Sequence, residues 1–341
     1  MHGSAWDGRN TVTPLKSSLE VLWHPIARAT LLFAVLPFFL QAIGGYISLA
    51  TEVLIMSMFA VAFNLLLAYT GLTSFGHAAY LGLGAYGFAL CQLHLTHGAW
   101  FTPLMAGTLL AGIIAFVVGY IISTKRGIYY SLLTFAIGQL FYFIGMRWNE
   151  VTGGETGLTG LTRPVIRIPG MMAINLANNY VFYYFILVTF VVTTVILWKI
   201  VHSPFGSVLK IIEQNELRAK YLGYNTFRYK CACFTISGVL SGFAGALYAM
   251  FTYCAFADYL YWVNSGDVVM ITLIGGGLTS FFGPLAGAAI FIIARNLISS
   301  FTQHWQIFMG TLFVVFILIF PEGLFGLLNK KGFRTAMRIK G

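Results

Sequence analysis

Long apolar runs make up most of this chain, and short polar or glycine-rich connections separate them. A bilayer core needs about 20 apolar residues per helix, and the sequence offers about ten such stretches. Helices satisfy their backbone hydrogen bonds internally, as lipid requires, and the alternating pattern of membrane β-strands is absent. The pattern predicts an all-α integral membrane protein with about ten spans. We expect them near residues 28–49 (interrupted by Pro37), 52–69, 74–93, 101–122, 128–146, 180–200, 229–254, 268–274, 284–299 and 305–320.

Small residues are concentrated in the third and seventh spans. Glycine in a helix costs about 1 kcal/mol relative to alanine, so such a concentration needs a packing reason. Close approach of a neighbouring helix, or of a solute, supplies one. The third span carries Gly76, Ala78, Ala79, Gly82, Gly84, Ala85 and Gly87, and the seventh repeats Ser237, Ser241, Gly245 and Ala249 on one face.

The eighth span is interrupted by Gly275, Gly276 and Gly277. The apolar stretch before them, residues 268–274, is too short to cross a bilayer. We therefore expect a short or broken helix that opens at the glycines. Unwound backbone at this depth is tolerated only against protein or a water-lined cavity.

Ser203–Asn225 is the longest strongly polar stretch that has a helical pattern. Ser203 suits an N-cap, Pro204 suits the first helical position, and Gly223 suits the left-handed position past the end. The segment predicts one small helix. Its expected apolar side consists of Val208, Ile211, Ile212 and Leu222. The helix either joins two spans at the membrane surface or docks into another protein there.

Two connections differ in character. Residues 69–74 are short enough to predict a tight turn. The loop over residues 147–179 is long and contains VTGGETGLTGLTRP, a composition typical of turns and irregular segments. We expect this loop to lie outside, as either a flexible solvated segment or an ordered docking or gating surface.

Composition excludes an ordinary soluble protein, because 58% of the residues are hydrophobic and only 9% are charged; soluble domains carry about 25% charged residues. The net charge of +10 lacks a nucleic-acid motif, so no nucleic-acid partner is expected. Most Lys and Arg residues fall on one side when both termini and alternate connections lie inside, as the positive-inside rule predicts. The exceptions are Arg147, Arg163, Arg167 and Arg295.

This assignment divides the chain into three parts. Residues 1–27 form a cytoplasmic N-terminal segment, residues 28–328 the transmembrane domain, and residues 329–341 a basic cytoplasmic tail. The polar segment 203–225 is then cytoplasmic as well.

Enzyme chemistry is poorly represented. The sequence lacks an ATP-binding loop, a His-Glu-x-x-His zinc motif, a Gly-x-Ser-x-Gly elbow and a Cys-x-x-Cys pair. We therefore expect the protein to bind neither a metal nor a cofactor, and we do not expect it to be an enzyme. Ion-driven carriers usually place carboxylates within their spans, and none is evident at a central position. A permease that takes its energy from a partner fits this pattern.

Few ionisable groups lie near membrane depth. Glu52 falls at a span end, and His77 falls in the glycine-rich third span. We expect His77 to be a packed, hydrogen-bonded residue near a helix start, with gating as the alternative. For Arg295, inside the ninth span, we expect pairing with a carbonyl or extension toward the interface rather than binding to a carboxylate.

Five motifs in order carry a family resemblance. They are Gly71–Tyr86, Thr152–Gly160, Ser203–Asn225, Ser241–Ala249 and Gly275–Ala288. Together they resemble the permease subunits of high-affinity branched-chain amino-acid ABC importers, the LivM type, over about residues 51–328.

The resemblance implies an ABC importer permease fold in a bacterial plasma (inner) membrane. It implies three kinds of partner: a second related permease, two cytoplasmic ATP-binding subunits and an extracytoplasmic solute-binding protein. Segment 203–225 is the family's coupling loop to the ATPase. The matching positions are Pro204, Gly206, Glu213, Asn215, Glu216, Ala219, Leu222 and Gly223. Gln214 is uncharged where the family often carries arginine, which weakens the case for one particular salt bridge.

Residues expected at the translocation path or in helix packing come from the small-residue motifs. They are Ser74, Gly76, His77, Gly82, Ser241, Gly245, Gly275, Gly276 and Gly277. Two alternative functions stay open. A urea or short-chain amide ABC importer permease has similar motifs, and a stand-alone channel or ion-coupled carrier belongs to another class.

Overall fold

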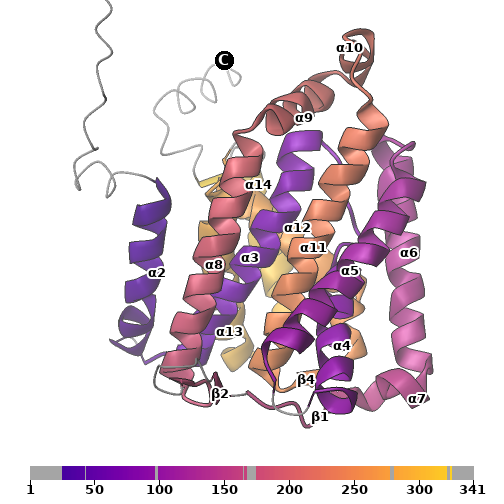
Figure 1. Ribbon diagram of the computed structural model, residues 1–341. Coiled ribbons are helices and arrows are strands. Elements are labelled where there is room, and N and C mark those ends of the chain that lie inside the picture. Colours follow the sequence, from indigo (N-terminus) through magenta and orange to yellow (C-terminus); the bar gives the residue numbers. More distant parts are fainter. Residues whose placement is uncertain are drawn as a thin grey trace, which may run out of the picture.

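The chain folds into a bundle of helices (Figure 1). The computed structural model describes residues 25–42, 44–96, 99–163, 165–166, 174–276, 280–320 and 323–324. The long elements are α2 (Pro25–Ala42), α3 (Ile47–Thr70), α4 (Ala78–His94), α5 (Phe101–Ile122), α6 (Gly127–Arg147), α8 (Asn179–Val201), α11 (Thr226–Thr252), α12 (Trp262–Gly276), α13 (Gly283–Phe301) and α14 (Trp305–Ile319).

Short elements connect the long helices at both ends of the bundle. They are α7 (Asn149–Thr152), η1 (Gly154–Thr156), β1 (Leu158–Thr159), β2 (Val165–Ile166), β3 (Ile174–Asn175), α9 (Pro204–Gln214), α10 (Glu216–Tyr221), β4 (Cys254–Ala255) and η2 (Ala257–Leu260). Helices α9 and α10 lie at one end, which we call the elbow end (Figure 1). The strands and α7 lie at the other, the loop end, where β1 pairs antiparallel with β4 and β2 with β3.

The prediction of an all-α membrane protein is confirmed. Within the described residues, six helices are long and apolar enough to cross a membrane: α3, α5, α6, α8, α11 and α13. Helix α5 has the predicted bounds, residues 101–122, and α6 and α8 each extend the predicted span by one residue at either end.

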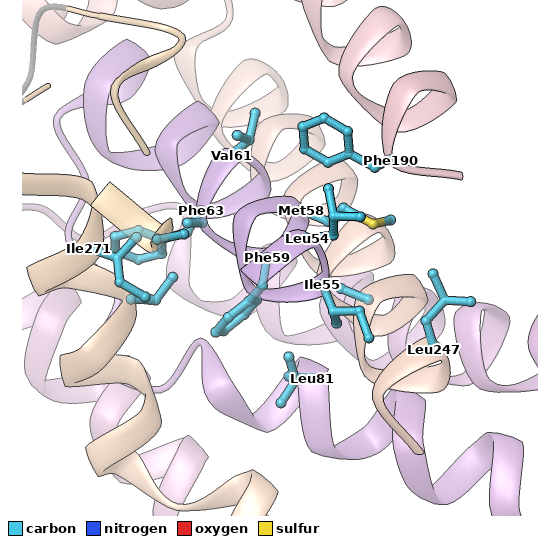
Figure 2. Close-up of a cluster of buried hydrophobic side chains, with 14 of the residues drawn as sticks. Leu54, Ile55, Met58, Phe59, Val61, Phe63, Leu81, Phe190, Leu247 and Ile271 are labelled. Atoms are coloured by element: carbon cyan, nitrogen blue, oxygen red, sulfur yellow. The ribbon is translucent and has the colours of Figure 1, made fainter. Parts of the chain in front are cut away.

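Helix α3 lies at the centre of the bundle, and most of its side chains are buried. Figure 2 shows its Leu54 and Phe59 within a cluster that also contains Leu81 of α4, Leu247 of α11 and Ile271 of α12. An amphipathic pattern is therefore absent from α3, because protein surrounds it on nearly every side.

Small residues allow α4, α5 and α11 to approach one another closely. A Cβ atom added to Gly84 of α4 would lie 2.0 Å from the carbonyl oxygen of Gly242 in α11. One added to Gly245 would lie 1.8 Å from the carbonyl oxygen of Leu81. The third and seventh spans thus make the close helix contact that their composition predicts.

Helices α12 and α13 form an antiparallel hairpin that also depends on glycine. A Cβ atom on Gly275 would lie 1.8 Å from the carbonyl oxygen of Gly283. The predicted short eighth helix is α12, which has 15 residues and begins at Trp262, six residues before the predicted start. It ends at Gly276, and Gly277 lies outside the described residues.

The first two spans divide at a different place from the one predicted. Helix α2 ends at Ala42 rather than Leu49, and α3 begins at Ile47. Gly44 in the connection has a φ of 86°, a left-handed conformation that ends the helix. The predicted N-terminal segment and basic tail lie outside the described residues, except that residues 25–27 already belong to α2.

The chain reverses at Gly71, which has a left-handed φ of 67°, but the third span does not become helical near Ser74 as predicted. Residues 71–77 form a non-helical segment that runs from the elbow end into the middle of the bundle, and α4 begins only at Ala78. The depth is evident from His77, whose ring stacks on Phe59 in the middle of α3. The segment fits because Gly76 lacks a side chain: a Cβ there would lie 1.9 Å from the carbonyl oxygen of Thr134 in α6.

These contacts predict which glycines tolerate a methyl group. Gly245→Ala should lower the free energy of unfolding by about 1–3 kcal/mol, because the added carbon overlaps the α4 backbone. Gly310→Ala in α14 is the matched control, since a Cβ there meets nothing within 4 Å. Thermal unfolding of the purified variants in detergent measures both effects. Equal melting temperatures for the two variants would contradict the packing role of Gly245.

Candidate functional site

The polar segment 203–225 folds as two helices rather than the single predicted helix; we call this segment the elbow. Asn215 interrupts it with an extended backbone, at φ −160° and ψ 101°. The Asn215 side-chain oxygen then accepts a hydrogen bond from the backbone amide of Arg218 at 3.0 Å, so Asn215 caps α10. Pro204 occupies the first turn of α9, as predicted, whereas the Ser203 hydroxyl donates to the carbonyl of Ile200 instead of capping α9.

Apolar contacts fix the elbow to the bundle. Val208, Ile212 and Ala219 form a small buried cluster against which Ile211 and Tyr229 pack. Leu222, predicted to join this side, is instead 62% exposed. The Lys210 ammonium lies 5.4 Å from the ring centroid of Tyr69, at the end of α3.

Glu216 is the electrostatic centre of the elbow. Its carboxylate, 11% exposed, lies 2.7 Å from Arg126 Nε at the start of α6 and 3.3 Å from Lys230 Nζ in α11. It also accepts a hydrogen bond from the Thr226 hydroxyl at 2.9 Å. Lys230 is only 2% exposed and donates to the Lys125 carbonyl as well. Lys220, on the same helix as Glu216, is a third cation at 4.0 Å. Glu216 therefore ties α10 to the starts of both α6 and α11, where cations compensate its charge.

The tip of the elbow exposes apolar and aromatic side chains. Tyr221 is 88% exposed, Leu222 62% and Leu217 55%. They stand beside exposed Lys220 and Arg218. Exposed apolar groups with a charged surround, on a rigidly held element, are typical of a protein-docking surface.

The coupling residues implied by the resemblance divide into two groups. Gly206, Ala219 and Glu216 face the protein, and a Cβ on Gly206 would lie 2.0 Å from the Val201 carbonyl oxygen. Five others are exposed: Pro204, Glu213, Asn215, Leu222 and Gly223. Gly223 has a φ of 87°, the left-handed conformation predicted for it.

His77 lies in the interior, where the non-helical segment meets α4. The side chain is fully buried, and Nε2 lies 3.0 Å from the hydroxyls of both Ser237 and Ser241. Phe59, Phe63, Tyr80 and Phe234 surround its ring. His77 is thus packed and hydrogen-bonded near a helix start, as predicted, while a gating role stays a prediction.

The other small residues predicted for the path or for packing lie in contacts between elements. Gly82 faces Leu260 of η2, and Gly245 faces Leu81 of α4. Gly275 and Gly276 both face Gly283 across the hairpin. Ser74 is buried within the same non-helical segment, residues 71–77, as Gly76. The structure therefore brings Ser74, Gly76, His77 and Ser241 together, whereas the hairpin glycines form a separate group.

At the loop end, Arg163 organises the long connection, a role that was not predicted. It is 9% exposed and donates to the carbonyls of Met250 and Phe251, at 3.2 and 2.9 Å, and to the Asn179 side chain at 2.8 Å. Its guanidinium lies 3.9 Å from the Phe182 ring centroid, and burial lowers its pKa. The described part of this loop is therefore ordered, because Arg163 binds the carbonyls at the end of α11.

Three charged side chains lie inside the half of the bundle nearer the loop end. Arg295 of α13 pairs with the Glu52 carboxylate of α3, so the predicted carbonyl partner is wrong. Asp267 of α12 lies on the same small cavity as Arg295. Asp267 was not among the predicted site residues, because the apolar run begins after it, whereas α12 begins five residues before it.

Comparisons with known proteins agree on one family. A family model described as the branched-chain amino acid transport system permease component matches residues 45–319. The chain is 25% identical to the high-affinity branched-chain amino acid transport permease protein LivM of Escherichia coli K12, over 82% of this chain and 70% of that protein. LivM of Salmonella typhimurium gives the same identity and coverage.

A more distant relative comes from an archaeon. The probable LivM of Methanocaldococcus jannaschii is 22% identical, over 61% of this chain and 59% of that protein. No solved structure matches the chain.

The Glu216 contacts predict a local effect on the elbow. Glu216→Ala should raise amide hydrogen exchange in α10 about tenfold or more, because the buried Lys230 would lose its anionic partner at a cost of about 1–3 kcal/mol. Glu213→Ala, an exposed glutamate on α9, is the matched control and should leave exchange in α10 unchanged. Mass spectrometry of the purified variants measures this exchange. Similar protection of α10 in the two variants would contradict the role given to Glu216.

Proposed function

Because this chain belongs to the family of branched-chain amino acid transport permeases, we propose that it is the membrane-spanning subunit of an ATP-driven ABC importer. Its substrates are leucine, isoleucine, valine or related amino acids, which it carries into the cytoplasm. The chain lacks an ATP-binding loop, so hydrolysis falls to two separate cytoplasmic subunits. A second related permease and a solute-binding protein complete the assembly.

The elbow is the observation that carries this proposal. It combines an exposed apolar tip, Tyr221 and Leu222, with salt bridges from Glu216 that attach α10 to α6 and α11. A docking element transmits force only if it is rigid relative to the helices that it drives. The tip would sit in a groove of the ATPase. The Glu216 salt bridges would then carry the motion of the ATPase into the helix bundle.

Charge distribution supports a cytoplasmic elbow. The elbow and the helix ends beside it carry Lys125, Arg126, Lys199, Lys210, Arg218, Lys220, Arg228 and Lys230. The loop-end connection carries Arg147, Arg163 and Arg167, and Arg163 is committed to backbone carbonyls. The positive-inside rule therefore favours an elbow on the cytoplasmic side of an inner membrane. The loop end then faces outward, where a solute-binding protein would dock.

The helices that flank the elbow supply the moving parts. Two residues separate α8 from α9, and four residues separate α10 from α11. Helix α11 also carries Ser237 and Ser241, which hold His77, and Gly245, which contacts α4. A tilt of the elbow would therefore act directly on the contact between α11 and α4 and switch access to the path.

Truncation of the tip tests the proposal in the full assembly. Tyr221→Ala combined with Leu222→Ala should lower solute-stimulated ATP hydrolysis and leucine uptake at least about tenfold, as loss of an interface hot spot does. The matched control is Ile128→Ala combined with Tyr129→Ala, another adjacent exposed pair, at the start of α6. It should retain both activities.

The measurement uses proteoliposomes that contain this permease, its partner permease, both ATPases and the binding protein. Leucine, isoleucine, valine, phenylalanine and urea are offered in turn. Uptake of urea in place of the amino acids would contradict the proposed substrates. Solute flux through this chain alone, without ATPases, would contradict the importer mechanism and favour a channel or carrier.

A further inference from the structure

A narrow cavity lies between α3, α4, α12 and α13, in the half of α3 nearer the loop end. Its charged and polar lining residues are Arg295, Asp267 and Asn264. The rest of the lining is apolar and consists of Met56, Phe59, Leu81, Val268, Ile271, Phe291 and Ile292. Figure 2 shows that Phe59, Leu81 and Ile271 come from three different helices. A cavity that combines opposite charges with aliphatic and aromatic walls suits an amphipathic ligand.

The charges of this site are not balanced. Arg295 pairs with Glu52, which neutralises both groups. Asp267 is a second carboxylate on the same cavity as that arginine, and no hydrogen bond or ion pair of the described residues includes its side chain. A structural ion pair needs one carboxylate for one arginine, and a further carboxylate at membrane depth is costly without a cation.

The missing cation is better supplied by a ligand than by a metal ion. The described residues contain no group of three or more His, Cys, Asp and Glu side chains that could hold a metal. The Arg295 guanidinium on the same cavity would also repel a divalent ion. An ammonium group needs only one carboxylate and an acceptor such as the amide oxygen of Asn264.

We propose that this cavity binds a zwitterionic aliphatic amino acid. Its ammonium group faces Asp267, and its carboxylate competes with the Glu52 carboxylate for binding to Arg295. The aliphatic side chain packs against the apolar wall formed by Phe59, Ile271 and Phe291. The inference rests on the proposed function and assigns a substrate site within this chain. A zwitterion fits because its positive group balances Asp267 while its negative group can replace Glu52 on the arginine.

Entry of the substrate requires movement of the α12–α13 hairpin. The cavity measures about 20 Å³, enough for a group of the size of water or ammonium but not for a whole amino acid. The close contacts of Gly275 with Gly283 and of Gly287 with Ile271 keep α12 and α13 together. The pair therefore moves as one unit away from α3, which lengthens the Arg295–Glu52 contact and frees the guanidinium for the substrate.

Leucine analogues that lack one charge provide the test. The assembled permeases and ATPases, without the binding protein, are titrated with leucine, 4-methylpentanoate, which lacks the ammonium group, and 3-methylbutylamine, which lacks the carboxylate. Saturation-transfer NMR measures each dissociation constant. Leucine should bind at least about tenfold more tightly than either analogue, since each lost charge removes a buried pairing.

Variants then assign each charge to a residue. Asp267→Asn should weaken leucine binding at least about tenfold and leave 4-methylpentanoate unchanged, because only the ammonium contact is lost. Arg295→Met combined with Glu52→Gln should weaken leucine and 4-methylpentanoate but leave 3-methylbutylamine unchanged. The double variant removes one positive and one negative charge together, so that no glutamate is left without its arginine. Asp258→Asn, the same change at an exposed position of η2, is the matched control and should bind leucine normally.

Two results would overturn the inference. One is absence of leucine binding to the wild-type assembly, and the other is an equal effect of Asp267→Asn on leucine and on 4-methylpentanoate. Uptake driven by ATP, measured in parallel with the binding protein present, separates this failure from failure of the proposed function. Normal amino-acid uptake without charge-dependent binding removes only the cavity assignment, whereas absence of all amino-acid uptake removes the importer.

Discussion

Satisfying backbone hydrogen bonds away from water is the constraint on which this architecture depends. Residues 71–77 leave helical geometry yet enter the bundle, where lipid offers no hydrogen bonds. Neighbouring helices supply them: Ser131 of α6 donates to the Thr73 carbonyl at 2.8 Å, and Ser265 of α12 accepts from the Ala78 amide at 2.8 Å. Hydroxyl groups on surrounding helices therefore determine where α4 can begin, and α6 and α12 are held beside the same short segment.

Helix α11 links the features that the proposed mechanism needs. At the elbow end Lys230 pairs with Glu216, in the middle Ser237 and Ser241 hold His77, and nearer the loop end Gly245 contacts α4. A helix is stiff over this length, so displacement of one end is felt at the others. Tight glycine contacts transmit this displacement rather than absorb it, because packed interiors are hardly compressible.

The sequence predicted the elements whose signal is local. The apolar run of α5, Pro204 at the start of α9 and the left-handed Gly223 each reflect short-range preferences. It failed where partners lie far apart in the chain. Arg295 meets Glu52 across 243 positions, and nothing near either residue indicates the other. The inward course of residues 71–77 was missed for the same reason, since its hydrogen-bond partners belong to later helices and its apolar composition continues into α4.

The arrangement of charge separates energy input from the proposed recognition site. Glu216 and its cations gather at the elbow end, whereas Arg295, Glu52 and Asp267 lie in the half nearer the loop end, with the buried His77 segment between them. Each group of charges is paired within itself and lies at a different depth, so the proposed mechanism couples the two groups through packed helices rather than by direct electrostatic attraction. Helix α4 contacts α11 through Gly84 and lines the cavity through Leu81. In the proposed mechanism, motion that enters at α11 would therefore reach the charged cavity through α4.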